Sequence, residues 1–309
     1  MSGGHGFRSS YRLATVIRIT ALIGIVTISF SAIFVGLADV APATAGLFRA
    51  TYALPVLFLL NRISGDQRSR RLRMLAFASG LLLAGDVALW HTSIRLVGAG
   101  LSTVVANTQV LWVGLTAWIM FGERPTRTAF VVVPIVLVGV ALIGGVGSSN
   151  AYGDNPALGA GLALVASFFY ASFLLLFRAA NVEKGQTAGP LLDVSIGITV
   201  AFLAGGWLDP GFSLVPEWPA HGWLIALSLL VHTGGWLLIA TALPRLPALE
   251  TSVMLLLQPA GTILWAGIIF NERLATNQWI GVGLVLAGIL TAAVLGTVRR
   301  ADADTPPDP

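Results

Sequence analysis

The sequence predicts an all-α polytopic membrane protein in which ten transmembrane helices form two inverted five-helix repeats. Three observations lead to this fold class. The 309 residues are 56% hydrophobic and only 10% charged, whereas a soluble domain carries about 25% charged residues. Apolar stretches near the roughly 20 residues needed to cross a bilayer recur along the whole chain. Two of these stretches end in related sequences 149 positions apart, Phe121 to Arg124 and Phe270 to Arg273.

The expected helices divide into two groups of five. The first repeat covers residues 16–145 and contains helices at 16–37, 44–60, 72–94, 100–121 and 128–145. An outer linker at 146–156 is rich in Gly, Asn and Asp, which favour turns. The second repeat covers residues 157–298, with helices at 157–179, 187–207, 220–243, 248–270 and 277–298. Residues 1–15 are expected to be a cytoplasmic N-terminus, and the Asp- and Pro-rich residues 299–309 a disordered cytoplasmic tail.

The internal repeat is visible when residues 99–142 are laid on residues 248–291. Identical residues then coincide along the alignment, among them the pairs Gln109/Gln258, Glu123/Glu272 and Gly139/Gly288. An odd number of helices in each repeat makes the second half enter the membrane from the opposite side. This inverted arrangement is typical of secondary transporters with a site at the bilayer midplane.

The basic residues predict the orientation, because short cytoplasmic loops retain Lys and Arg. With the N-terminus inside, 15 of the 18 basic residues lie on the inner side, only Arg95 and Arg273 lie outside, and Arg49 lies within a helix. Both termini are therefore expected in the cytoplasm. The basic residues lie at membrane boundaries rather than on one soluble face, so no nucleic-acid partner is expected.

Charged groups inside the bilayer are the first candidates for a functional site, since each costs about 2.5 kcal/mol or more to insert. Arg49 and Asp86 lie at similar depths on the second and third helices, at a separation that an arginine side chain spans. One interpretation is an ion pair that holds the two helices together. The other is a substrate cavity in which Arg49 binds a carboxylate or phosphate and Asp86 binds an amine or a coupling proton. Together the two residues suit an amino-acid-like zwitterion.

Further polar and aromatic side chains inside the helices complete the set of candidates. The proton-coupling candidates are Asp86, His91, Asp193 and His232, although a buried histidine also serves as a hydrogen-bonded packing residue. Asn107, Gln109 and Gln258 suit either the cavity or interhelical hydrogen bonds. The aromatic side chains expected to bind apolar parts of a substrate are Trp90, Tyr170 and Trp236.

Two features are assigned structural roles. In each repeat a Glu-Arg pair follows a Gly or Asn break, where the carboxylate of Glu123 or Glu272 suits the positive end of the next helix. Small residues predict close packing of the fifth and tenth helices. These residues are Gly139, Gly283, Ala287 and Gly288.

These motifs resemble the EamA-type branch of the drug/metabolite transporter superfamily. The resemblance rests on the sequences ending in Gly122-Glu123-Arg124 and Asn271-Glu272-Arg273, on Leu47-Phe48-Arg49 and on Gln258-Pro259. It implies a carrier in the cell's inner membrane that moves small metabolites or toxic compounds, usually outward, without ATP hydrolysis. The single lysine, Lys184, is not part of a phosphate-binding GxxxxGK[ST] loop, which agrees with that implication.

The sequence favours a proton-coupled exporter, and two alternatives stay open. One is a facilitator or importer of nucleotide-sugar-like or other anionic solutes. Such solutes normally require several cations in the cavity, and the sequence places only one arginine inside the membrane. The other is a membrane-embedded enzyme subunit, although the chain lacks HExxH and GxSxG motifs. The expected partners are a small-molecule substrate and the lipid bilayer. No cofactor or metal is expected, and the chain is predicted to act as a monomer or a homodimer.

Overall fold

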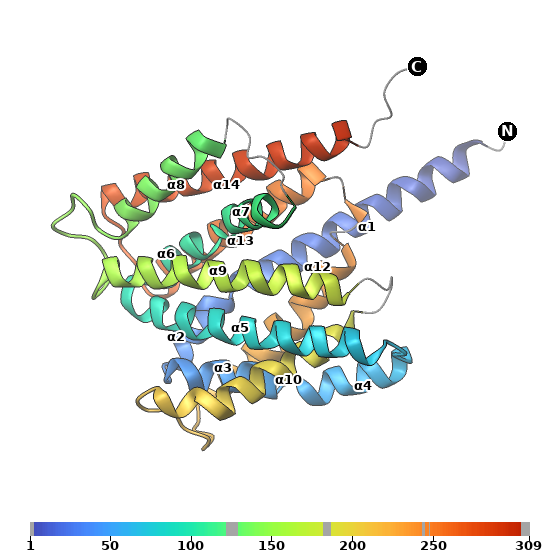
Figure 1. The fold of residues 1–309 in the computed structure, drawn as a ribbon, viewed down its shortest axis with the longest axis horizontal. Helices are drawn as coiled ribbons and strands as arrows, with labels where there is room; N and C mark the ends of the chain where they lie inside the picture. The colour runs from blue at the N-terminus through green and yellow to red at the C-terminus, as the bar shows by residue number, and fades with distance from the viewer. Residues whose placement is uncertain (1–2, 122–128, 182–186, 243–244, 247, 304–309) are drawn as a thin grey trace.

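The computed structural model describes residues 3–121, 129–181, 187–242, 245–246 and 248–303. These residues are almost entirely helical, and no strand occurs among them (Figure 1). The helices, in chain order, are α1 (Gly3–Ser29), α2 (Ser31–Ala38), α3 (Pro42–Thr51), α4 (Leu54–Ser64), α5 (Arg70–Val97), α6 (Ala99–Ala106), α7 (Gln109–Phe121), α8 (Ala129–Ile143), α9 (Pro156–Ala180), α10 (Ala188–Gly205), η1 (Gly206–Leu208), α11 (Ala220–Ala226), the π-helix η2 (Leu227–Gly235), α12 (Trp236–Ala242), α13 (Ala248–Ile269) and α14 (Thr276–Ala303).

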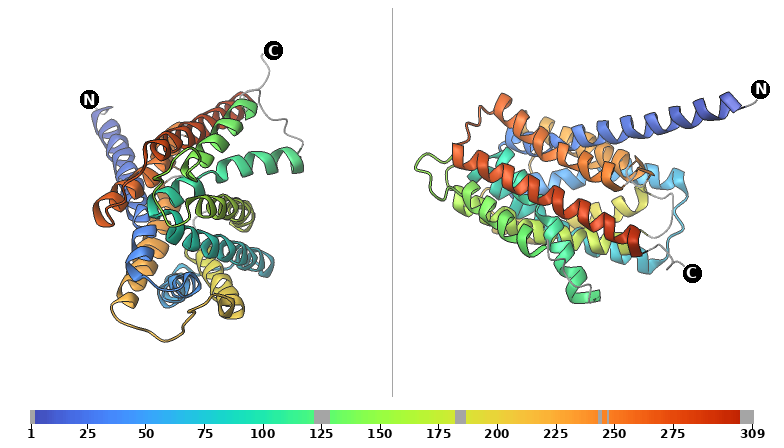
Figure 2. Two further views of the ribbon diagram at one scale, coloured as in Figure 1. Left: turned by 90° about the vertical axis from the view of Figure 1, so that its left-hand side faces the viewer. Right: turned by 90° about the horizontal axis from the view of Figure 1, so that it is seen from above.

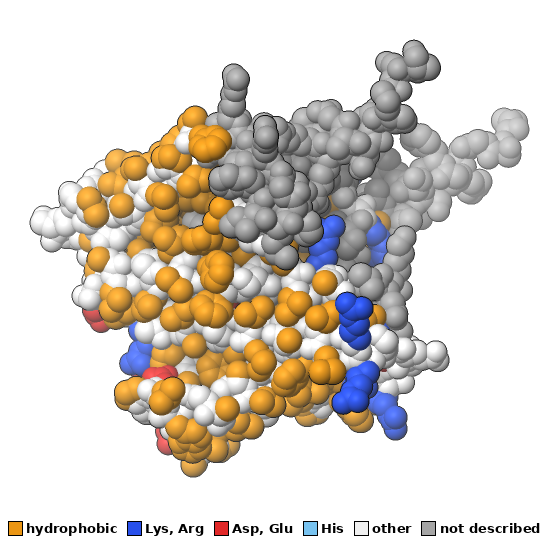
Figure 3. All heavy atoms as spheres, viewed as in Figure 1, with side chains coloured by type: hydrophobic (Ala, Val, Ile, Leu, Met, Phe, Trp, Pro, Cys, Tyr) orange, Lys and Arg blue, Asp and Glu red, His pale blue; other side chains and the backbone are white. Residues whose placement is uncertain are grey.

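The length and apolar composition of its helices indicate that this bundle is a membrane protein. Within the described residues, six helical segments are long and apolar enough to cross a membrane: Thr15–Ala38, Pro42–Ser64, Arg70–Val97, Pro156–Ala180, Ala188–Leu208 and Ala220–Ala242. Three shorter apolar helices add to them, at Phe130–Ile143, Met254–Ile269 and Thr276–Ala292. Hydrophobic side chains cover much of the face drawn in Figure 3. A surface this apolar suits hydrocarbon rather than water.

Several segments expected as single helices are divided. A turn at Phe30 separates α1 from α2, and Pro55, which has no backbone N–H to donate, lies in the first turn of α4 after the break from α3. Asn107 and Thr108 separate α6 from α7, and both side chains bond to backbone carbonyls of the preceding turn. Such bonds compete with the helix ladder. At the other end of the chain, α14 continues to Ala303, past its expected end at residue 298.

Close approach of α8 and α14 confirms the predicted packing of the fifth and tenth apolar helices. A Cβ atom on Gly139 would lie 2.9 Å from the Gly281 carbonyl oxygen, so the two backbones touch. Gly288 likewise faces Val136. The prediction was wrong for Gly283, because its added Cβ would meet nothing within 4 Å. The contact follows the face of α14 that carries Gly281 and Gly288, and Figures 1 and 2 show the two helices side by side.

Glu272 bonds to a different helix from the one that its sequence context predicts. The expectation was that its carboxylate would meet the start of the following helix, α14. Instead, Glu272 accepts hydrogen bonds from the backbone N–H groups of Ala99, at 2.7 Å, and Gly100, at 3.2 Å, at the start of α6. A carboxylate does lie at a positive helix end, as predicted, but it joins the two halves of the chain. The equivalent Glu123 lies outside the described residues.

The two ends of the bundle differ in charge. The start of α1 and the end of α14 lie at the same end (Figure 1). Most of the arginines visible in Figure 3 gather at that end, while acidic side chains appear at the opposite one. The exposed arginines of the basic end include Arg70, Arg71 and Arg178.

Candidate functional site

A central polar cluster occupies the middle of the bundle. It consists of Arg49 on α3, Asp86 and Trp90 on α5, Tyr170 on α9, His232 on η2 and Trp236 at the start of α12. The Arg49 guanidinium lies 5.8 Å from the centre of the Trp90 ring. It is also close enough to Asp86, Tyr170 and His232 to interact with them electrostatically. The ring of Trp236 lies 6.5 Å from that of Tyr170. The structure thus brings together six of the residues selected from the sequence.

Arg49 and Asp86 approach each other without forming an ion pair. The two residues are 8% and 7% exposed, yet no contact within 4.0 Å joins the guanidinium to the carboxylate. Arg49 Nη1 has no hydrogen-bond partner. A buried charge left in this way costs far more than a paired one. This geometry argues against a simple ion pair between α3 and α5 and leaves Nη1 of Arg49 available to a ligand.

Other buried polar atoms of the cluster also lack partners. They are Nε1 of Trp90, Nδ1 of His232 and, beside it on the π-helix, Oγ1 of Thr233. His232 Nε2 is bonded to Ser195 Oγ at 2.9 Å, so only one side of its ring is satisfied. An unsatisfied buried group costs about 1–3 kcal/mol, and several in one place suit a site for a polar ligand. A π-helix at such a place is also typical of functional sites.

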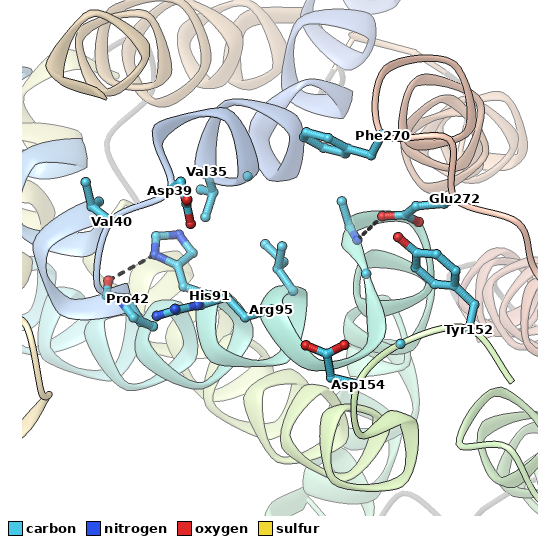
Figure 4. Close-up of a pocket in the computed structure, with 15 residues that line it drawn as sticks. Val35, Asp39, Val40, Pro42, His91, Arg95, Tyr152, Asp154, Phe270 and Glu272 are labelled. Atoms are coloured by element: carbon cyan, nitrogen blue, oxygen red, sulfur yellow. Dashed lines mark hydrogen bonds between the residues drawn. The ribbon is translucent and has the colours of Figure 1, made fainter. Parts of the chain in front are cut away.

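An acidic pocket of about 500 Å³ opens at the end of the bundle opposite the chain termini. Its charged and polar lining comprises Asp39 after α2, His91 and Arg95 on α5, Tyr152 and Asp154 in the linker before α9, and Glu272 after α13 (Figure 4). Its volume lies within the range of small-molecule sites. Burial raises the pKa of Glu272, although its two backbone hydrogen bonds act in the opposite direction. Residues of both sequence repeats form this pocket.

His91 lines the acidic pocket and also borders the central cluster, since its ring lies 5.4 Å from that of Trp90 and it interacts electrostatically with Arg49. Its ring is fully buried, and Nδ1 lies 3.2 Å from the Pro42 carbonyl oxygen. Because a carbonyl can only accept, Nδ1 carries the proton of this bond. Nε2 has no partner.

At the opposite end, an ion-pair network joins the α4–α5 connection to α10. Arg68 Nη2 donates to Asp66 at 2.9 Å and to Asp193 at 2.7 Å, and Arg73 lies 3.7 Å from Asp193. The side-chain hydrogen bond from Arg68 holds the pKa of Asp66 below its ordinary value. Asp193, selected from the sequence as a proton site, is therefore a member of this Arg68 network.

The hydrogen bonds of the described residues do not connect the remaining candidates, Asn107, Gln109 and Gln258, to the central cluster or to the acidic pocket. Asn107 donates to the Thr103 carbonyl within α6, at 2.8 Å, which accounts for its amide locally. The side chains of Gln109 and Gln258 are not joined by a hydrogen bond within the described residues. Pro259 does not break α13, which continues through it, and the Gln258 carbonyl accepts from Thr262.

Sequence reasoning missed the acidic pocket and the burial of Arg68. Asp39 and Asp154 were not among the residues selected from the sequence, and Arg68 was only one of the 15 basic residues expected on the inner side. The spacing of Asp66 and Arg68 permits their own pairing, but nothing local connects them to Asp193, 125 positions away. The positive φ of Asp39, 45°, marks a constrained backbone at the pocket, but it is visible only in the structure.

The fold is that of a polytopic membrane protein whose helices enclose a buried polar cluster. A family model described as "EamA-like transporter family" matches residues 15–145 and 157–294. The chain belongs to this family, and is therefore a membrane transporter of small solutes, as its sequence resemblance implied. These matches point to a transporter rather than an enzyme.

Two individual proteins extend the comparison. An uncharacterized transporter of Synechocystis sp. is 21% identical over 257 residues, which cover 79% of this chain and 77% of the relative. A protein of known crystal structure has a TM-score of 0.57 at 16% identity and is matched over 94% of this chain and 99% of its own. The second likeness concerns the fold alone.

Proposed function

We propose that this chain is a secondary active transporter that exports small zwitterionic metabolites, amino acids or related compounds, by alternating access through a central cavity. The observation that carries this proposal is the Arg49 guanidinium, which is buried beside Asp86 without an ion pair and has an unpartnered Nη1. The planar fork of Arg49 suits a carboxylate, and Asp86 suits an ammonium group. The rings of Trp90, Tyr170 and Trp236 give the apolar part of the solute a surface to contact.

In this proposal the chain crosses the membrane ten times as two inverted five-helix repeats. Helices that follow one another directly then form one membrane span together. Examples are α1 with α2, α3 with α4 and α6 with α7. The two segments matched by the family model correspond to the two repeats. The protein lies in the inner membrane with both termini in the cytoplasm; this orientation is supported by the arginines that gather at the end of the bundle where α1 begins and α14 ends (Figures 1 and 3). It acts as a monomer or a homodimer.

Proton coupling is assigned to the Arg68 network. The acidic pocket is open at the outer end, while the Arg68 network joins α10 to the α4–α5 connection at the inner end. Protonation of Asp193 would remove one charge from its bond with Arg68 and weaken the inner closure. A proton entering with the gradient would thus favour the inward-open state, which then loads solute for export.

Thermal unfolding of the purified protein with a panel of amino acids, nucleosides and hydrophobic cations tests the proposed site. A ligand that binds the folded state raises its apparent stability. We expect stabilisation by some amino acids in the natural chain, and its loss in Arg49→Ala and in Asp86→Asn. Arg178→Ala, which removes an exposed arginine, is the control. Stabilisation that persists in both site variants would reject the zwitterion site.

The absence of cysteine from the sequence permits a direct test of orientation. Single cysteines replacing Glu217 or Arg178, both exposed, are treated in intact cells with a membrane-impermeant maleimide. We expect labelling of the Glu217→Cys protein in intact cells and of the Arg178→Cys protein only after permeabilisation. The reverse pattern would overturn the proposed orientation.

A further inference from the structure

We propose that the acidic pocket is a binding site for a small molecule with a primary ammonium group, which donates a hydrogen bond to Nε2 of His91. A role for this site in transport rests on the proposed function, whereas binding of the ammonium group does not depend on it. Three carboxylates line the pocket, those of Asp39, Asp154 and Glu272, against the single guanidinium of Arg95. The lining therefore favours a cation.

His91 gives the pocket a specific acceptor in addition to its negative charge. The imidazole is 0% exposed and forms part of the pocket wall. Its Nδ1–H is directed to the Pro42 carbonyl, and a fully buried imidazolium would be costly without a partner. In the neutral ring Nε2 is then a lone-pair acceptor, and no donor reaches it. A buried acceptor without a donor, on the wall of a cavity large enough for a ligand, is a site that a ligand N–H completes.

Asp39 provides the charge at the same end of the pocket. Figure 4 shows Asp39, His91 and Arg95 at one end, with Tyr152 and Glu272 at the other. Asp39 ends α2 in a left-handed conformation, at φ 45° and ψ 45°, which few residues other than Gly, Asn and Asp adopt readily. Glu272 is already engaged by two backbone N–H groups. Asp39 is thus the acidic side chain available to an ammonium group near His91.

The rest of the pocket limits the size of the ligand. Its volume of about 500 Å³ admits a small solute. Apolar side chains, among them Val35, Ile94 and Phe270, face the same space. A ligand with a primary ammonium head and a short apolar chain satisfies both parts of the lining. Arg95 reduces the attraction for cations and is expected to weaken binding of a ligand that lacks a carboxylate.

Two monovalent cations that differ in their N–H groups separate the hydrogen bond from simple charge attraction. n-Butylammonium donates N–H bonds, whereas tetramethylammonium has the same charge and no N–H. Sodium butyrate serves as the anionic probe. Binding is measured by thermal unfolding of the full chain in detergent, followed by tryptophan fluorescence at constant ionic strength. Since this readout requires no transport, its failure is separate from failure of the proposed carrier function.

The natural chain should bind n-butylammonium about tenfold more tightly than tetramethylammonium, the ratio expected for one charge-assisted hydrogen bond. His91→Asn keeps an N–H for the Pro42 carbonyl and removes the acceptor at the Nε2 position, so it should abolish this preference. His91→Gln places an amide oxygen near that position and should restore part of it. Equal binding of the two cations, or an unchanged preference in His91→Asn, would overturn the proposal.

Charge variants test the remainder of the site and do not depend on folding of the His91 variants. Asp39→Asn tolerates the left-handed conformation and should weaken n-butylammonium binding about threefold. Arg95→Gln should strengthen it, and Glu217→Gln, which removes an exposed charge outside the pocket, should leave it unchanged. Tighter binding of butyrate than of n-butylammonium, or no effect of Asp39→Asn, would contradict an ammonium site.

Discussion

The contact between Glu272 and the start of α6 leads to a quantitative prediction. The carboxylate accepts from Ala99 N at 2.7 Å and from Gly100 N at 3.2 Å. Each lost bond to a partly buried backbone donor costs about 1 kcal/mol. Glu272→Ala should therefore lower the free energy of unfolding by about 2 kcal/mol. Glu272→Gln keeps an oxygen for the shorter bond and should cost about 1 kcal/mol or less.

The pH dependence of this effect has a definite sign. Burial raises the pKa of Glu272 above its ordinary value of 4.5. Because the folded-state pKa is the higher one, protonation favours the folded state. The stability of the natural chain relative to Glu272→Gln should therefore rise as pH falls through the raised pKa, and level off below 4.5.

Denaturant unfolding in detergent, followed by tryptophan fluorescence over a pH series, measures both effects. Glu217→Gln, an exposed acid elsewhere in the chain, is the control and should match the natural chain within about 0.5 kcal/mol. Two results would refute the reasoning. One is Glu272→Ala as stable as the natural chain, and the other is Glu272→Gln as damaging as Glu272→Ala.

Three further predictions concern packing and the Arg68 network. Gly281→Ala would place a Cβ 2.6 Å from the Gly139 carbonyl oxygen and should destabilise the protein by about 1–3 kcal/mol in thermal unfolding, whereas Gly283→Ala, which meets nothing within 4 Å, should be neutral or slightly stabilising. Arg68→Met removes the buried cation that bonds Asp66 and Asp193, leaving Asp193 only Arg73 at 3.7 Å, and should lower the unfolding free energy by about 3 kcal/mol or more; a change below about 1 kcal/mol would show that the network contributes little. The stability due to Asp66, whose pKa the Arg68 hydrogen bond depresses, should be lost as pH falls through that depressed value, and Asp66→Asn should flatten this acid limb in a pH series of unfolding midpoints.

Much of the fold could be predicted because it depends on local composition. The helix expected at 72–94 is found as α5 over Arg70–Val97, and that expected at 157–179 as α9 over Pro156–Ala180. An uninterrupted apolar run of this length has few alternatives in a bilayer. The breaks at Phe30 and at Asn107 and Thr108 were not predicted. They depend on packing and on local side-chain bonds that a hydropathy pattern does not contain.

The central cluster was predictable in its members but not in its geometry. Arg49, Asp86 and His232 were selected because charged or strongly polar groups are costly inside a bilayer. Whether Arg49 pairs with Asp86 depends on how α3 and α5 pack, and the sequence left that question open. The acidic pocket is less accessible to such reasoning, since loops and helix ends far apart in the chain supply its lining. The contact between Glu272 and Ala99 joins residues 173 positions apart.

The most direct test of the central claim is solute counterflow into proteoliposomes that contain the purified protein. Vesicles loaded with an unlabelled amino acid that stabilises the protein are diluted into the same amino acid carrying a radiolabel. Uptake of the label should be fast with the natural chain and with the Arg178→Ala control, and should fall to the level of empty vesicles with Arg49→Ala. Uptake by Arg49→Ala at the natural rate would contradict a carrier whose solute carboxylate binds Arg49.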